Sequence, residues 1–145
     1  MTDWERRFID ERRVARLATV DASGQPSAIP IVYAFDGAVL FTPLDAKPKR
    51  VAPAKLKRVR NINANPLVAV IIDSYNEDWR LLAWVQVQGR ARIVTGGDEY
   101  IAGITLLAAK YPQYERMPLA GRPLIVIEPA RIGSWRASDA AALFD

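Results

Sequence analysis

The segment FDGAVLFTPLDAKPKR, residues 35–50, decides the fold. Its Asp36-Gly37 pair lies between two β-rich runs and is a strong signal for a tight turn between antiparallel strands. The sequence therefore predicts a strand over Ser27–Phe35 that pairs with a strand over Ala38–Thr42. This hairpin indicates an antiparallel sheet, and a short basic loop leaves it at its far end.

The basic loop after the hairpin is a candidate phosphate site. Pro48 favours an extended conformation at Lys47, and alternate residues of an extended segment point the same way. Lys47 and Lys49 can therefore converge on one anion, with Arg50 beside them. Pro53 fits the first turn of a helix, whose positive end would face the loop. The alternative is a solvated basic loop that leads into a solvated basic helix.

Towards the N-terminus, the sequence predicts one helix and one strand before the hairpin. Thr2 and Glu5 have the spacing of a capping box, which begins a helix. Val14–Val20 is typical of a strand. Pro30 lies inside the second predicted strand and cannot donate a ladder hydrogen bond, so it marks a bulge or an edge.

Towards the C-terminus, the basic helix is expected to end at Asn65, before a proline. Leu67–Asp73 is almost entirely apolar and β-branched, which predicts a central strand buried on both faces. Apolar and polar residues alternate over Arg80–Val94, which predicts one core face and one wet face. The other predicted elements are a helix after Gly96-Gly97-Asp98 that carries Ile101, Ile104, Leu107 and Ala108, and strands over Leu124–Ile127 and Ile132–Arg136.

Composition limits the chemistry. The chain has 145 residues, no cysteine and no histidine, which excludes disulfides, a thiolate nucleophile and the commonest general base and metal ligand. Any reaction must rely on a bound cofactor or on carboxylates, lysines and tyrosines. Asp73 and Asp78 flank a turn, and we favour a turn role over paired acid–base carboxylates. Trp79 and Trp84 lie in an apolar region and are interpreted as core or dimer contacts.

The formal charge of +4 is unevenly distributed, because seven Lys or Arg and no acid lie between Asp45 and Asp73. Such a field attracts phosphates, polyanionic cofactors or nucleic acid. A nucleic-acid binder is disfavoured because the cluster lacks interleaved aromatic residues. No apolar run has membrane-spanning length and no secretory signal is present. We therefore expect a cytoplasmic protein with no membrane or nucleic-acid partner.

Several segments, taken in order, resemble the pyridoxamine 5′-phosphate oxidase-like split-barrel family. The N-terminal part of the resemblance rests on residues 13–20 (RVARLATV), 24–26 (GQP) and 29–33 (IPIVY). Other segments resemble the branch of flavin- or deazaflavin-dependent oxidoreductases often named for coenzyme F420. They are residues 45–50 (DAKPKR), 61–66 (NINANP), 75–79 (YNEDW), 87–92 (VQGRAR) and 133–136 (GSWR).

The fold implied by the resemblance agrees with the strand pattern. Six or more strands with hairpin signals and interspersed helices indicate a closed antiparallel barrel flanked by helices. The resemblance implies a mainly β (α+β) fold: a six- to seven-stranded antiparallel split β-barrel of the FMN-binding type. With no repeat or linker in the sequence, we expect a single flavin- or deazaflavin-binding domain over residues 1–145.

The resemblance also implies a homodimer with two cofactor sites at the subunit interface. The basic loop would hold the cofactor phosphate, with Thr42 near the strand end, unless Thr42 is an ordinary strand threonine. Lys57 and Arg60 could reach a polyglutamate tail, and Gln86 could approach the cofactor. The implied cofactor-binding residues are Pro30, Ile31, Val32, Thr42, Pro43, Lys47, Lys49, Arg50, Lys57, Gln88 and Trp135.

The implied function is an F420-dependent oxidoreductase that transfers a hydride between the reduced cofactor and a small organic substrate. FMN is the alternative cofactor. Because the cofactor carries the reaction, no catalytic residue and no metal ligand are predicted. A non-catalytic flavin or haem carrier on the same fold is the other alternative, and the absence of histidine disfavours haem. The histidine and arginine substrate ligands of pyridoxamine phosphate oxidase itself are not found, which argues against pyridoxal phosphate synthesis.

Overall fold

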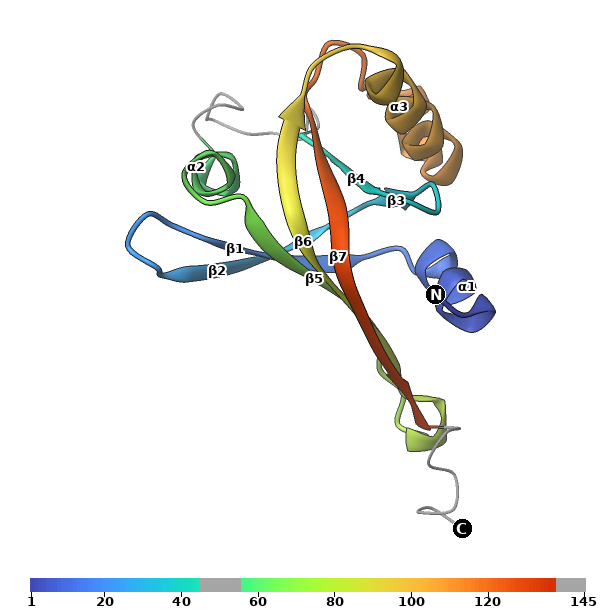
Figure 1. Ribbon diagram of the computed structural model, residues 1–145. Helices are drawn as coiled ribbons and strands as arrows, with labels where there is room; N and C mark the ends of the chain where they lie inside the picture. Colours follow the sequence, from blue (N-terminus) through green and yellow to red (C-terminus); the bar gives the residue numbers. More distant parts are fainter. Residues whose placement is uncertain (45–55, 138–145) are drawn as a thin grey trace.

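The computed structural model describes residues 1–44 and 56–137, and contains one curled antiparallel sheet with three helices around it (Figure 1). The strand order is β2-β1-β5-β6-β7-β4-β3. The strands are β1 Ala15–Val20, β2 Pro26–Ile31, β3 Ala34–Phe35, β4 Leu40–Pro43, β5 Leu67–Ser74, β6 Ala83–Val94 and β7 Leu124–Arg136. The helices are α1 Asp3–Glu11, α2 Lys57–Ala64 and α3 Asp98–Lys110, with short 3₁₀ turns η2 Trp79–Leu81 and η3 Pro112–Glu115.

The sheet confirms the predicted split-barrel class. Every described strand pair is antiparallel. Among the described residues, β2 and β3 form the two edges of the sheet. The sheet is therefore curled and open, and the expectation of a barrel closed on itself is wrong for the single chain.

The β3–β4 hairpin confirms the Asp36-Gly37 signal. Gly37 has a φ of 99°, in the region that favours glycine. The Asp36 carboxylate accepts hydrogen bonds from the backbone N–H groups of Ala38 and Val39, at 2.7 and 2.8 Å. The turn is therefore fixed both by glycine and by a side-chain acceptor.

The predicted strand over residues 27–35 is two strands, because Tyr33 is bonded outside the ladder. The Tyr33 N–H donates to the hydroxyl of Tyr111 at 3.1 Å, and the Tyr33 hydroxyl donates to the carbonyl of Ile9 at 2.6 Å. These bonds tie the chain to α1 and to the end of α3, so the ladder stops at Ile31. Pro30 was predicted to mark a bulge or an edge. It lies in β2, which is an edge strand of the sheet.

Helix α1 begins with the predicted capping box. The Glu5 N–H donates to the Thr2 hydroxyl at 3.3 Å, and the Thr2 N–H donates to the Glu5 carboxylate at 2.8 Å. The Ser134 hydroxyl of β7 also donates to Glu5. The cap therefore fixes the first turn of α1 against β7.

Helix α2 begins later than the sequence suggested. Leu56 is extended, with a ψ of 140°, so the helix starts at Lys57 and has no proline in its first turn. Pro53 lies outside the described residues. The helix ends at Ala64, one residue before the predicted Asn65, which is extended and caps the helix. Its Asn61 amide donates to the Thr19 hydroxyl of β1 at 2.9 Å, inside the protein.

The core lies on the inner face of the sheet and beneath α3. α3 packs so closely on β4 and β7 that a Cβ at Gly103 would overlap the side chains of Phe41 and Leu124. The face of α3 that packs inward carries Tyr100, Gly103 and Leu107. Ile101, one of the apolar residues that the sequence assigned to this helix, is 61% exposed.

Strand β5 differs from its prediction. Val68, Val70 and Ile72 are buried, but Leu67, which the pattern placed in a strand covered on both sides, is 53% exposed. Strand β6 confirms its predicted alternation of buried and exposed residues. β5, β6 and β7 thus share one uncovered surface opposite the core, called the outer face below.

Candidate functional site

The outer face is organised by the register of three long strands. One row across it joins Asp73, Trp84 and Trp135, one on each strand. The next joins Ile71, Gln86 and Gly133, and a third joins Ala69, Gln88 and Arg131. Towards η2, the ends of these strands project away from the three helices (Figure 1).

The first hollow of this face, the tryptophan pocket, is lined by Ile71, Asp73, Trp84 and Gln86 and has a volume of about 370 Å³. The Arg16 guanidinium donates to the Asp73 carboxylate at 2.6 Å. Trp84 is 37% exposed and Trp79 is 56% exposed, so they are not core residues, and their other interpretation, as dimer contacts, stays a prediction. An apolar wall, an amide and a satisfied carboxylate suit a flat ring with polar edges.

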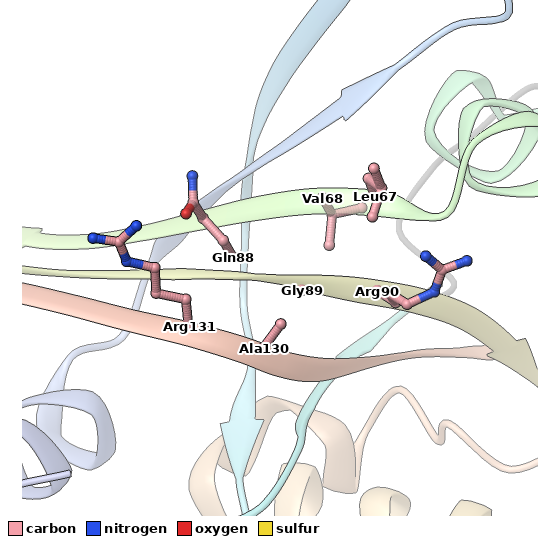
Figure 2. Close-up of a pocket in the computed structure, with 7 residues that line it drawn as sticks. All are labelled: Leu67, Val68, Gln88, Gly89, Arg90, Ala130 and Arg131. Carbon is pink, nitrogen blue, oxygen red and sulfur yellow. The ribbon is translucent and has the colours of Figure 1, made fainter.

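The second hollow, the arginine pocket, has a volume of about 460 Å³ and lies further along β6, towards α2. Figure 2 shows Arg131 and Gln88 at one end of it and Arg90 at the other, with Gly89 and Ala130 between them. Its lining residues are Leu67, Val68, Gln88, Gly89, Arg90, Ala130 and Arg131.

A bulge in β7 shapes the arginine pocket. Gly89 pairs with Pro129 while Gln88 pairs with Arg131, so Ala130 is an extra residue on β7. A Cβ at Gly89 would overlap the backbone carbonyl of Glu128, so only glycine fits there without a shift. The bulge returns Arg131 to the outer face, opposite Gln88.

The structure brings only some of the predicted cofactor residues together. Pro30, Gln88 and Trp135 lie on the outward side of their strands. Ile31 is a core residue and can contribute only its backbone, while Thr42 is buried within β4. The remaining predicted residues lie elsewhere: Val32 is half-buried beside Tyr111, Pro43 is buried and paired with Leu124, and Lys57 is exposed at the start of α2. Lys47, Lys49 and Arg50 lie outside the described residues.

Sequence reasoning missed the two arginines of the second pocket as candidates. The alternation of β6 already placed Arg90 on the same face as Gln86 and Gln88. No sequence signal placed Arg131 there, because its orientation depends on the bulge at Ala130.

The titratable group with the most unusual surroundings lies away from both pockets. The Lys110 ammonium lies 3.9 Å from the ring centre of Tyr33, is buried, and has no hydrogen-bond acceptor among the described residues. Burial, with help from nearby Arg13, lowers the pKa of Lys110 to about 8. Burial likewise raises the pKa of Tyr33 and of Tyr111. This cluster joins α1, α3 and the β2–β3 corner, so we interpret its role as structural rather than as part of either pocket.

The described residues contain no group of three or more acidic, cysteine or histidine side chains that could hold a metal ion. None of the described helices is long and apolar enough to cross a membrane.

Comparison with known proteins places the chain in a wider group. A family model described as Pyridoxamine 5′-phosphate oxidase matches residues 1–136. No curated protein sequence matches the chain.

Solved structures share the fold over most of the chain. The conserved hypothetical protein Rv2991 from Mycobacterium tuberculosis is 22% identical, with a TM-score of 0.76 over 97% of this chain and 88% of that one. The haem storage protein HutZ from Vibrio cholerae is 17% identical, with a TM-score of 0.71 over 92% of each chain. A structure described as F420 reductase is 26% identical, with a TM-score of 0.62 over 88% of this chain and 94% of that one.

Proposed function

The chain belongs to the pyridoxamine 5′-phosphate oxidase family, and from this premise we propose that it is an F420-dependent oxidoreductase with a small organic substrate. FMN is the alternative cofactor. The observation that carries the proposal is the tryptophan pocket, an apolar hollow with one amide beside the Trp84–Trp135 row. The similarity to an F420 reductase supports the choice of cofactor.

The protein's own residues would bind and orient the cofactor. When bound, a reduced deazaflavin or flavin supplies the hydride. Ile71 and Trp84 form an apolar surface for its ring, and the Gln86 amide can hydrogen-bond a polar ring edge. Lys47 and Lys49 would neutralise the phosphate through charge-assisted hydrogen bonds of roughly 1.5–3 kcal/mol each.

The proposal includes a homodimer with cofactor sites at its interface. The projecting end of the sheet carries exposed apolar side chains that the described residues leave uncovered. They are called the distal patch: Tyr75, Trp79, Leu81 and Trp84. Exposed apolar side chains gathered at one end of a sheet are typical of interaction sites. Because Trp84 belongs to both the patch and the tryptophan pocket, a second copy seated on the patch would border the ring site.

The proposal is tested by titrating F420 and FMN, side by side, into the wild type and a Lys47→Ala/Lys49→Ala double variant. Losing two charge-assisted hydrogen bonds should weaken binding by about a hundredfold or more. A double variant of two exposed arginines, Arg7→Ala/Arg116→Ala, removes the same charge elsewhere and should bind normally. Wild-type affinity in the lysine variant, or no binding of either cofactor by the wild type, would contradict the proposal.

A non-catalytic carrier is the second candidate function. The similarity to a haem storage protein favours it, whereas the absence of histidine removes the usual axial ligand of haem. Turnover separates the two functions. If each protein molecule oxidises many molecules of reduced F420 with an added acceptor, the protein is an enzyme. If it binds a flavin or haem tightly but shows no turnover, it is a carrier.

A further inference from the structure

The arginine pocket contains two cations that no described residue neutralises. Arg90 and Arg131 are both exposed, and neither guanidinium group forms an ion pair or a hydrogen bond with the residues that the structure describes. Val68, Gly89 and Ala130 line the apolar floor of this pocket, and Figure 2 shows the two guanidinium groups at its opposite ends.

Other arginines on the outward side of the sheet are neutralised. Arg16 pairs with Asp73 at 2.6 Å. Arg92 bonds two carboxylates, Glu99 and, at 3.0 Å, Glu128. Glu128 lies directly opposite Arg90 in the β6–β7 register, yet its carboxylate bonds Arg92 instead. The carboxylate opposite Arg90 is therefore already paired with Arg92, and the two arginines of the pocket stay positively charged.

We propose that the arginine pocket binds a small organic oxyanion, a carboxylate or a phosphate carried on an apolar body. A planar guanidinium donates two parallel hydrogen bonds to either group, which a hydrated surface lysine does not do. The apolar floor accepts the body of the ligand, and a volume of about 460 Å³ is within the usual range for small-molecule sites. This assignment goes beyond the redox function and does not depend on the identity of the cofactor.

The test measures binding of three probes to the full-length protein by ligand-detected NMR titration, without cofactor. Benzoate and phenyl phosphate carry the two possible anions, and benzamide is the neutral control of the same shape. We expect one or both anions to bind at least tenfold more tightly than benzamide. The anion that binds more tightly shows whether the pocket prefers a carboxylate or a phosphate. Equal affinity of all three probes overturns the proposal.

Variants then locate the binding. Arg90→Gln and Arg131→Gln should each weaken binding of the anion by about tenfold or more. Ala130→Leu should abolish binding of the probe without a change of charge, because it fills the space between the arginines. Arg7→Gln removes an exposed arginine of α1, outside both pockets, and should leave anion affinity unchanged.

The oligomeric state of each variant separates a ligand site from a contact between copies. If Arg90→Gln/Arg131→Gln keeps the wild-type oligomeric state and circular dichroism but loses the anion, the proposal stands. If that variant changes the oligomeric state and wild-type protein binds no probe, the arginines serve an interface and the proposal fails.

Discussion

Gly89 lies where the backbone of β7 comes too close to β6 for a Cβ, and its missing side chain shapes the arginine pocket. The neighbouring carbonyl of Glu128 occupies the place of a Cβ. The same contact accompanies the bulge that turns Arg131 outward. One glycine therefore controls both the packing of two strands and the placement of a charge.

We predict that Gly89→Ala destabilises the protein. The added methyl group meets backbone, which cannot rotate away, so a cost of about 1–3 kcal/mol in the free energy of unfolding is expected. Urea denaturation measures it. Gly133→Ala is the matched control, since a Cβ there has no atom within 4 Å, and it should change stability little. Equal stability of the two variants would show that the strands separate freely at Gly89.

At the scale of elements, the Tyr33 cluster joins α1 and α3 to the corner between β2 and β3. The hydroxyl of Tyr111, just after α3, donates to the carbonyls of Arg13 and Tyr33, at 2.9 and 3.0 Å. The Arg13 guanidinium donates to the carbonyl of Lys110 at 2.7 Å. The Lys110 ammonium is thus enclosed by aromatic rings and by another cation.

Lys110 makes stability depend on pH. Its pKa is about 8 in the folded protein, against the ordinary lysine value of 10.5 in the unfolded chain, so the unfolded chain binds more protons between these two pH values. Stability should therefore rise from pH 8 towards pH 10. Above about pH 10, Tyr33 and Tyr111 lower the stability as pH rises. Burial raises their pKa in the folded protein, so the unfolded chain loses their protons first.

The predicted measurement is the free energy of unfolding in urea at pH 7.5 and pH 9.5. Wild type should gain stability between the two, and Lys110→Met should lose most of that gain. Lys57→Met, which removes an exposed lysine, should keep it. A wild-type curve that is flat in this window would mean that the Lys110 ammonium is solvated in solution.

The elements that the sequence predicted well are those fixed by local rules. The capping box at Thr2, the turn at Gly37 and the alternation of β6 depend on neighbours in the chain, and the structure confirms them. The both-face burial of β5 was wrong because Leu67 is equally apolar whether or not anything covers it. The break after β2 was missed because it depends on Tyr111, 78 residues from Tyr33 in sequence.

At the scale of the whole molecule, some residues of the candidate site could be predicted from local sequence pattern and others could not. The outward positions of Gln88 and Arg90 could be predicted from strand periodicity. The position of Arg131 could not, since a bulge shifts the phase of β7. The basic loop, to which the sequence assigned the phosphate, lies outside the described residues, so that assignment stays a prediction. The structure adds the two pockets and the distal patch. Of these, the arginine pocket arises only because β7, which is distant in sequence from β5, lies beside β6 in the sheet (Figure 1).

The distal patch predicts how the molecule associates. Trp79 and Leu81 lie on the η2 turn at the projecting end of the sheet, where they are 56% and 59% exposed among the residues that the structure describes. Burying two such side chains is worth about 1.5–3 kcal/mol each, and a two-fold dimer buries each of them twice. Trp79→Ser/Leu81→Ser should therefore weaken the dimer by several kcal/mol and give monomers at micromolar concentration.

Sedimentation velocity over a concentration series measures this association. Ile101→Ser is the matched control, because Ile101 is 61% exposed on α3, away from the patch, and the dimer should survive that change. Because Trp84 connects the patch to the tryptophan pocket, the monomeric variant should also bind F420 or FMN more weakly than wild type. A wild type that remains monomeric at high concentration would contradict the dimer. A monomeric variant with undiminished cofactor affinity would instead place the ring site within one chain.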